Sequence, residues 1–403
     1  MPRIPTAYKD LPTGWRWSRL DHACIGIYDC PHSTPKLTDT GPYLVRTQDM
    51  DTGVFRSERA AHVSNATYHE RISRVRPRHG DLLYSREGSY HGIAAEVPAD
   101  RLVCLGQRLV LIRPDPEILD HSFLRHWLNS TLMADYVRGF RDGSAAERLN
   151  LPTIRALPVA IPPLEDQRTM SSFLSTLEQK VGSNRRIADT ALLMLDNMTM
   201  ELGYDFPVTT LSELADVTRN SFSPSSLGDT PMDHFSIPFF DSDRLPERVP
   251  AASVMSAKLL ITEPCILVSR LNPRTNRTWF ANPVEGVVAG CSTEFLVLQP
   301  RANVTLGSLW MAVRDGFFVA ELARRVTGTS GSHQRVGPAD ALSINVSDVR
   351  QLSSSHTDKA NYLLKIAHQR TIESSRLIAT RDSLSPQLLS GRTSLELSSA
   401  MSS

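Results

Sequence analysis

The chain has 403 residues, of which 41% are hydrophobic and 22% are charged. These proportions are typical of globular proteins, so they exclude a disordered or fibrous chain, and the length predicts two or three domains. The formal net charge is only +1, which excludes a positive field over the whole chain. Any contact with nucleic acid must therefore come from local clusters of basic residues.

The sequence has no feature typical of a membrane or secreted protein. No apolar run approaches the roughly 20 residues that span a bilayer, and the N-terminal residues lack the apolar core of a secretory signal. The five cysteines are odd in number and scattered, which argues against a disulfide framework. We therefore expect a reduced, cytoplasmic protein.

Residues 1–163 are predicted to form a first globular domain. Residues 81–86 form an apolar strand that ends in Ser-Arg, and residues 108–114 form a second apolar strand that proline ends. A helical stretch follows over residues 123–137, with Trp127 near its centre. The small polar loop 143–149 then leads to the end of the domain.

Polar residues near the ends of these strands are candidates for DNA contacts. Glycines permit a close approach of the backbone after the strand 81–86, and the neighbouring side chains can donate hydrogen bonds. Ordinary turns and solvated loops explain the same residue types. The candidates are Arg46, Gln48, Arg86, Ser89, Tyr90, His91, Gln107, Arg141, Ser144 and Arg148. The run Arg71, Arg74, Arg76 and Arg78 is expected on an exposed face, where it could contact phosphate.

Residues 164–203 are predicted to form a long amphipathic helix. Apolar residues recur at spacings of three and four, close to a heptad rhythm, and include Leu174, Leu177, Val181 and Leu195. The preceding Pro162 and Pro163 prevent the helix from beginning earlier. About 36 helical residues would span roughly 54 Å, because each adds about 1.5 Å.

Residues 204–352 repeat the plan of the first domain at an offset of about 185 residues. The matching segments occur in the same order, namely an apolar strand that ends in Ser-Arg (265–270), a strand ended by proline (294–300), a helical stretch around Trp310 (306–325) and a small polar loop (328–336). A long helical segment again closes the repeat. Several matches in one order indicate an internal duplication, and hence a second globular domain.

The second domain has its own candidates for DNA contacts. The segment 269–278 contains three arginines and two asparagines without an acidic residue, and these residue types form paired hydrogen bonds with guanine and adenine. An ordinary solvated hairpin is the alternative. The candidates are Arg270, Asn272, Arg274, Asn276, Arg277, Ser292, Thr329, Ser330, Ser332, His333 and Arg335.

Residues 353–403 are predicted to form a second long helix with a frayed, Ser-rich tail. Its apolar rhythm includes Leu363, Ile366 and Leu377 but is weaker, and Ser-rich stretches and Pro386 interrupt it. A helix of this length cannot bury its apolar stripe alone, so we expect the two long helices to pack together. Packing of each helix on its own domain is the alternative.

The sequence lacks the motifs of an enzyme that acts alone. It contains no phosphate-binding Gly-x-x-x-x-Gly-Lys-Ser/Thr loop, no dinucleotide-binding Gly-x-Gly-x-x-Gly turn and no His-Glu-x-x-His. It also lacks the Asn/Asp-Pro-Pro-aromatic element that holds a flipped adenine in amino-methyltransferases. Cys24 and Cys30, with His22 and His32 nearby, match no usual zinc spacing. We therefore expect no catalysis, no metal and no cofactor in this chain.

Three segments resemble the specificity (S) subunit of type I restriction-modification systems. Leu11-Pro-Thr-Gly-Trp-Arg-Trp-Ser-Arg-Leu20 resembles the opening of a recognition domain, and Gly80-Asp-Leu-Leu-Tyr-Ser-Arg86 resembles its internal strand. Leu149-Asn-Leu-Pro-Thr-Ile-Arg-Ala-Leu-Pro158, followed by Ile161-Pro-Pro-Leu-Glu-Asp-Gln167, resembles the junction with the first central helix. In the second half, residues 334–343 lack the Leu-Asn and Pro-Pro-Leu elements of that junction.

The resemblance implies a fold of class α/β (α+β) with two target recognition domains, each a mixed β-sheet with helices, separated by two long antiparallel, coiled-coil-like helices. The expected segments are recognition domain 1 (1–163), central helix 1 (164–203), recognition domain 2 (204–352) and helix 2 with its tail (353–403). The residues expected to pack each long helix on its partner helix are Leu174, Leu177, Val181, Leu195, Leu363, Ile366 and Leu377. Such helices also bind partner subunits.

The resemblance also implies a non-catalytic DNA reader within a larger complex. Each recognition domain would read one half of a split, asymmetric DNA site. Two methyltransferase (M) subunits would carry S-adenosylmethionine and methylate adenine N6, and a nuclease (R) subunit, if present, would use ATP and Mg²⁺. Two alternatives remain, which are a recognition subunit of another methylation-based phage-defence complex and a self-sufficient DNA methyltransferase.

Overall fold

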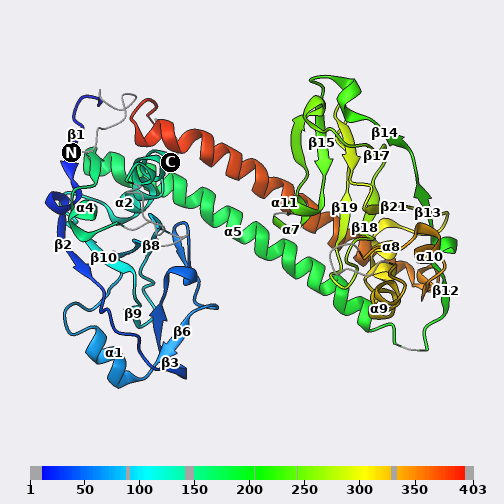
Figure 1. The fold of residues 1–403 in the computed structure, drawn as a ribbon, viewed down its shortest axis with the longest axis horizontal. Coiled ribbons are helices and arrows are strands. Elements are labelled where there is room, and N and C mark those ends of the chain that lie inside the picture. The colour runs from blue at the N-terminus through cyan, green and yellow to red at the C-terminus, as the bar shows by residue number, and fades with distance from the viewer. Residues whose placement is uncertain are drawn as a thin grey trace, which may run out of the picture. The chain divides into compact units, whose positions relative to one another are not determined.

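The computed structural model describes residues 11–87, 91–140, 149–203, 205–242, 244–327 and 334–394. The chain divides into two compact units, which Figure 1 shows as separate sets of strands and helices. Unit 1 comprises residues 1–179 and 378–403, and unit 2 comprises residues 180–377. Each unit therefore contains part of both long helices. None of the helices in the described part of the chain combines the length and apolar character that a bilayer span requires.

Unit 1 is built from short strands and a few short helices. Its strands are β1 (Arg16–Arg19), β2 (Cys24–Asp29), β3 (Leu37–Val45), β4 (Met50–Asp51), β5 (Val54–Phe55), β6 (Ala61–Val63), β7 (Leu82–Ser85), β8 (Ala94–Glu96), β9 (Val103–Leu105), β10 (Leu109–Pro114) and β11 (Pro158–Ile161). Its short helices are α1 (Asn65–Arg71), α2 (His121–Leu128), α3 (Thr131–Arg138) and α4 (Leu151–Arg155).

The central sheet of unit 1 has the strand order β2-β10-β7-β8, and all its pairs are antiparallel. Leu82 pairs with Ile112 and Glu96, whereas Ser85 pairs with Leu109, which fixes the two ends of the sheet. A smaller sheet, β6-β3-β9, contains a parallel pair. The apolar runs in β7 and β10 are buried on both faces, as their unbroken hydrophobic character predicts.

Unit 2 contains a second set of strands and short helices. Its strands are β12 (Val208–Thr210), β13 (Ala215–Thr218), β14 (Ser221–Phe222), β15 (Pro231–Phe235), β16 (Glu247–Pro250), β17 (Lys258–Ile261), β18 (Cys265–Ser269), β19 (Thr278–Ala281), β20 (Val288–Cys291), β21 (Phe295–Pro300) and β22 (Asn345–Ser347). Its short helices are α6 (Leu211–Leu214), α7 (Ile237–Ser242), α8 (Leu306–Arg314), α9 (Gly316–Arg324) and α10 (Pro338–Leu342).

The two units share one strand order. In unit 2 the sheet β13-β21-β18-β19 corresponds to β2-β10-β7-β8, and the pair β12-β22 corresponds to β1-β11. A second sheet, β14-β17-β20-β15-β16, contains one parallel pair, as the smaller sheet of unit 1 does. The apolar strands that repeat in the sequence are β7 and β10 in unit 1 and β18 and β21 in unit 2, and they hold the same places in the two strand orders. The predicted internal duplication and the mixed α/β fold class are therefore confirmed.

Two long helices connect the units. Helix α5 (Leu164–Met200) and helix α11 (Ser354–Leu389) each lie partly in both units. Unit 1 contains the first part of α5 and the last part of α11, so the helices run through the units in opposite chain directions. Helix α11 continues through Pro386. The expected interruption there is wrong, because a proline in the last turn removes only one backbone hydrogen bond.

The predicted apolar residues of α5 and α11 pack within each unit. Leu174 is buried in the core of unit 1, together with Leu388 and Leu389 of α11. In unit 2, Leu195 of α5 shares a core with Leu363 of α11. The other members of the predicted stripe are buried or half-buried, and they are Leu177, Val181, Ile366 and Leu377. Packing of the helices on each other and packing on the domains therefore occur together.

Side-chain amides fix the long helices to the short Trp-containing helices. In unit 1, the fully buried Gln167 of α5 accepts a hydrogen bond from the amide of Asp120, the N-cap of α2, at 2.8 Å. In unit 2, Asn361 of α11 accepts one from the amide of Gly307 in α8, also at 2.8 Å. These bonds satisfy helix N-terminal donors that would otherwise lack partners. A Cβ at Gly307 would clash with the backbone of Asn361, so this close approach requires glycine.

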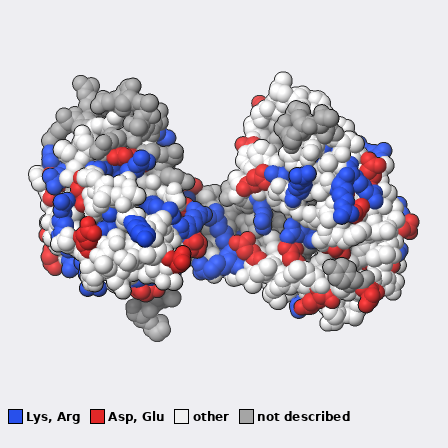
Figure 2. All heavy atoms as spheres, turned by 60° about the horizontal axis from the view of Figure 1, so that its bottom comes forward, with Lys and Arg blue, Asp and Glu red and all other residues white. Residues whose placement is uncertain are grey.

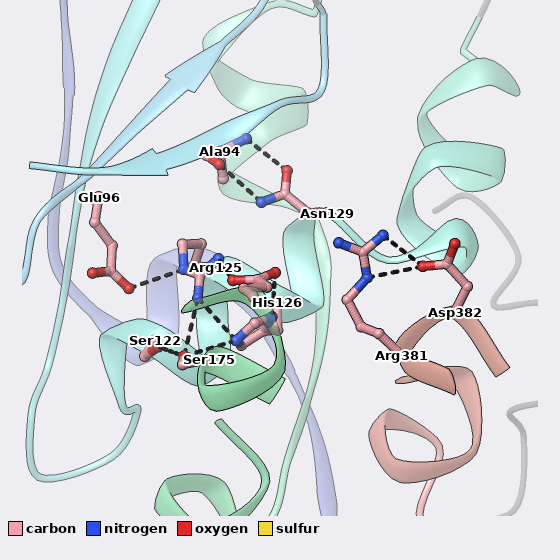
Figure 3. Close-up of polar contacts among 10 residues, drawn as sticks. Ala94, Glu96, Ser122, Arg125, His126, Asn129, Ser175, Arg381 and Asp382 are labelled. Carbon is pink, nitrogen blue, oxygen red and sulfur yellow. Dashed lines mark hydrogen bonds and ion pairs between the residues drawn. The ribbon is translucent and has the colours of Figure 1, made fainter. Parts of the chain in front are cut away.

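A buried arginine forms the main polar contact between unit 1 and its part of α5. Figure 3 shows Arg125 of α2 between Glu96, His126 and Ser175. Its guanidinium donates to Glu96 (2.9 Å) and to Glu178 of α5 (2.8 Å). It also donates to Nε2 of His126 at 2.9 Å, so this nitrogen accepts. Burial, followed by the charge of Arg125, lowers the pKa of His126 to about 2.

Unit 2 has a corresponding contact at the other end of α5. Arg314, the last residue of α8, donates to Asp196 of α5 at 2.9 Å through Nε. In each unit, an arginine from the helix that follows the central strand therefore binds a carboxylate of α5. A charged group in a partly buried pair needs a close partner. The pairs Arg125–Glu178 and Arg314–Asp196 therefore mark where each unit binds α5.

Candidate nucleic-acid interface

Arg86, the first candidate after β7, is not available on the surface. Its side chain is 4% exposed, and Nη1 lies 3.1 Å from a carboxylate oxygen of Asp29. The sheet register explains this contact, because Ser85 and Asp29 pair with adjacent residues of β10. Arg86 is therefore buried and paired with Asp29, and its contact with DNA stays a prediction. His91, in the same loop, is half-buried.

The other described candidates of unit 1 differ in whether their polar groups form hydrogen bonds within the protein. Arg46 donates to both carboxylate oxygens of the buried Asp49, each at 2.8 Å, and these hydrogen bonds raise the pKa of Arg46. Gln107 donates to the carbonyl of His32 and to the hydroxyl of Thr34. Gln48 is exposed. Only Gln48 of these three presents its polar group without a described intramolecular partner.

The acid-free segment 269–278 gains acidic partners from elsewhere in unit 2. Arg277 donates to both oxygens of Asp241 in α7, at 2.7 and 2.9 Å. Arg270 lies 3.7 Å from Glu294, with which Arg335 also pairs at 2.8 Å. Asp241 and Glu294 therefore neutralise much of the positive charge of this segment, although the segment itself contains no acidic residue.

The remaining described candidates of this segment are polar but mostly engaged. Arg274 is exposed and has no described carboxylate partner. Asn276 accepts a hydrogen bond from Thr278 at 2.5 Å, and Ser292 accepts one from the amide of Glu294. Asn272 has a φ of +48°, a backbone conformation that asparagine tolerates better than most residues. Arg274 is the member best placed to meet a ligand.

A backbone hydrogen bond links corresponding residues of the two units. In unit 1, the amide of Leu149 donates to the carbonyl of Arg86 at 2.8 Å. In unit 2, the amide of Val336 donates to the carbonyl of Arg270 at 3.1 Å. In both units, the arginine that follows the repeated strand therefore lies beside the residue that follows the polar loop. Nine candidates lie outside the described residues, namely Ser89, Tyr90, Arg141, Ser144, Arg148, Thr329, Ser330, Ser332 and His333. The DNA contacts of all candidates remain predictions.

The predicted basic run of unit 1 is only partly exposed. Arg71 is buried, and its guanidinium donates to the carbonyls of Leu105 (2.7 and 2.9 Å) and Ser33 (3.1 Å), so its expected exposure is wrong. Arg74, Arg76 and Arg78 are exposed. The sequence analysis missed two further arginines that join them in space, Arg101 and Arg113. No local pattern could reveal these two, because Arg101 lies in the loop before β9 and Arg113 lies in β10.

The face drawn in Figure 2 carries charges of both signs. Basic and acidic side chains are interspersed over each unit on this face, as the net charge of +1 predicts. Within the described ranges, no group of three or more His, Cys, Asp or Glu side chains could hold a metal ion. Burial raises the pKa of Cys24 to about 12, so its thiol is a poor metal ligand. The described chemistry therefore consists of hydrogen-bond donors and local groups of positive charge.

A family model identifies part of the chain. Residues 40–191 match the model of the type I restriction modification DNA specificity domain. Residues 40–191 are therefore similar to a type I DNA specificity domain. This match confirms the resemblance predicted from the sequence. The match begins within β3 and ends within α5. It includes Gly80–Arg86 and the junction with the first long helix, which carried part of the resemblance, whereas Leu11–Leu20 lies outside it.

Solved structures add the fold. The type I restriction-modification S subunit from M. genitalium has 14% sequence identity and a TM-score of 0.63 over 99% of this chain and 100% of that chain. At this identity, the likeness shows only that the two chains share a fold. The shared fold extends over nearly the whole chain, and thus beyond residues 40–191. A comparison with curated protein sequences gives no match.

Two further solved structures also match this chain. The HsdS subunit from Thermoanaerobacter tengcongensis has 17% identity and a TM-score of 0.36, over 98% of this chain and 100% of that chain. A chain from a study of complex assembly and conformational transition of the type I R-M system has 17% identity and a TM-score of 0.42, over 95% and 100%. Neither score supports a further structural conclusion.

Proposed function

We propose that this chain is the DNA-binding specificity subunit of a type I restriction-modification complex, and that it directs adenine N6 methylation or restriction to a bipartite DNA site. The observation that carries the proposal is the duplication, because the strand order of the unit that contains most of the specificity domain recurs in the other unit. Two copies of one DNA-reading plan fit a site with two half-sites.

The differences between the two units support an asymmetric site. The loop after β7 continues as Glu87-Gly-Ser-Tyr-His-Gly92, whereas the loop after β18 continues as Leu271-Asn-Pro-Arg-Thr-Asn-Arg277. Base edges are distinguished by the donors and acceptors that side chains present in the grooves. Loops of such different chemistry would therefore read different base sequences.

Partner subunits would supply the chemistry. The part of α5 in unit 2 exposes four large apolar side chains, Ile187 (39%), Leu193 (59%), Met194 (40%) and Met200 (73%). Exposed apolar side chains on one helix fit a protein interface, and we assign α5 and α11 to the binding of two methyltransferase subunits. Those subunits would hold S-adenosylmethionine, and a nuclease subunit, if present, would use ATP and Mg²⁺. This chain would hold no cofactor and catalyse no step.

Reconstitution tests this proposal. The full chain, its co-purifying methyltransferase and their mixture are each incubated with host DNA and labelled S-adenosylmethionine. We expect adenine methylation at a discrete split motif only in the mixture. Methylation by the isolated chain would establish a self-sufficient enzyme instead. Co-purification of a nuclease subunit with ATP-dependent cleavage supports the restriction complex over another methylation-based defence complex.

A further inference from the structure

Five arginines of unit 1 line an open groove of about 760 Å³ at one end of the central sheet. Resting on the proposed function, we propose that this groove binds the phosphodiester backbone of one strand of duplex DNA, independently of base sequence. The arginines are Arg74, Arg76, Arg78, Arg101 and Arg113. The groove is distinct from the candidate loops after β7 and before β10.

Strand register places the groove at the opposite end of the sheet from those loops. Leu82, at the start of β7, pairs with Glu96 and with Ile112. The loop before β7, the loop after β8 and Arg113 therefore lie together at this end. Ser85 pairs with Leu109 at the other end, where Arg86 and Gln107 lie. The groove therefore adds a contact region that the sequence-based candidates do not include.

The segment 74–78 presents arginines in a regular row. Exposure alternates along it, because Arg74, Arg76 and Arg78 are exposed, whereas Val75 is half-buried and Pro77 is buried. Alternation with a period of two is typical of extended backbone, and Pro77 favours an extended conformation at the preceding residue. Side chains two residues apart in such a segment are separated by about 6.6 Å. A row of this kind suits a linear polyanion with regularly spaced charges better than a single small anion.

The row carries positive charge that described acidic residues do not neutralise. No carboxylate in the described ranges pairs with Arg74, Arg76 or Arg78. Arg101 lies 3.8 Å from Asp100, which is itself 78% exposed. This arrangement differs from that of Arg46, Arg86 and Arg277, each of which has a close carboxylate partner.

The inner wall of the groove is rigidly held. Arg113 donates to both oxygens of the buried Asp81 at 2.8 Å and to the carbonyl of Arg76 at 2.9 Å. These bonds fix the loop that carries the row. Because the loop is ordered before binding, little conformational entropy would be lost when phosphate is bound. Arg113 is therefore a positioning residue, and the three exposed arginines would contact phosphate.

A matched pair of variants tests the groove. R76Q/R78Q removes two charges from the row, and R16Q/R155Q removes two charges from exposed positions of unit 1 outside the groove. Binding of the full chain to a labelled random-sequence duplex is measured between about 50 and 200 mM salt. The slope of log K against log salt is negative, and each lost phosphate contact reduces its magnitude by about 0.9. We expect R76Q/R78Q to reduce the magnitude of this slope by about 1.8 and to weaken binding at 100 mM salt by at least about tenfold.

The controls make each outcome decisive. R16Q/R155Q is expected to keep the wild-type slope, and R76K/R78K, which keeps both charges, should also keep it. Equal effects of the two double Gln variants, or an unchanged slope in R76Q/R78Q, would overturn the groove while wild-type binding still supports the proposed function. A wild-type chain that binds no duplex contradicts the proposed function itself. A loss confined to one duplex sequence would also overturn the groove, because phosphate contacts carry no base specificity.

Discussion

Arg125 is the residue of unit 1 whose replacement should be most disruptive. Its buried guanidinium binds Glu96, Glu178, Ser175 and His126. Arg125→Met would leave buried polar groups without their charged partner, so we expect a loss of about 3 kcal/mol in the free energy of unfolding. Urea unfolding followed by tryptophan fluorescence measures this loss. Arg138→Met, on the exposed end of α3, should change it by less than about 0.5 kcal/mol. Equal effects of the two variants would contradict the role of Arg125.

His126 should make stability depend on pH. The pKa of a free histidine is about 6.5, whereas burial and Arg125 lower that of His126 to about 2. Between these values, the unfolded chain binds a proton that the folded chain does not, so the free energy of unfolding falls as the pH falls. The expected slope is about 1.4 kcal/mol per pH unit.

The pH effect can be isolated between pH 6.5 and 5, above the range in which most carboxylates titrate. His126→Gln should remove the slope contributed by this side chain. His22→Gln, at a side chain that is 69% exposed, should leave the slope as in the wild type. Parallel stability curves for the wild type and His126→Gln would show that His126 does not titrate on unfolding.

The sequence predicted the candidate DNA-contact residues only in part, because their acidic partners lie far from them in the chain. Arg277 and Asp241 are separated by 36 residues, and Arg86 and Asp29 meet only because both flank β10. The sequence identifies arginines near strand ends but not the carboxylates that fold against them. The groove shows the converse case, since Arg101 and Arg113 join the row 74–78 only through the strand register.

Within α5, one fully buried asparagine lacks a hydrogen-bond partner. Both polar atoms of Asn184 are unsatisfied among the described residues. Because an unpaired buried amide costs about 1 to 3 kcal/mol, Asn184→Leu should raise the free energy of unfolding by about that amount. Asn197→Leu, at an exposed position of the same helix, should change it by less than about 0.5 kcal/mol. The free energy of unfolding is measured with urea. A lower value for Asn184→Leu than for the wild type would contradict the prediction, because it would mean that the Asn184 side chain makes a stabilising hydrogen bond.

The elements that were predictable are those with strong local patterns. The unbroken apolar runs of β7, β10, β18 and β21 indicated buried strands, and the three-four rhythm of α5 indicated a long helix. The parallel pairs β3-β9 and β15-β20 were not predictable, because their strands are short and far apart in sequence. Helix α11 shows that packing can maintain a helix whose own apolar rhythm is weak.

At the scale of the whole molecule, the lengths of the two long helices can be tested as the feature that sets the spacer between half-sites. If α5 and α11 set the distance between half-sites, four residues inserted after Gly182, with four inserted beside Glu373 in α11, would lengthen each helix by about 6 Å. Lys180 and Glu373 form an ion pair at 3.4 Å, so the insertions would be placed opposite each other. We expect the methylated motif to gain about two base pairs in its spacer, since each base pair adds about 3.4 Å. An unchanged spacer, read by sequencing of modified DNA, argues against a ruler.

The central claim is that this chain selects the DNA sites at which other subunits act. Sequencing of N6-methyladenine across the host genome, with and without the gene for this chain, tests the claim most directly. We predict that methylation at one split, asymmetric motif disappears when the gene is deleted and returns when the gene is restored. An identical set of methylated motifs in both strains would contradict the claim.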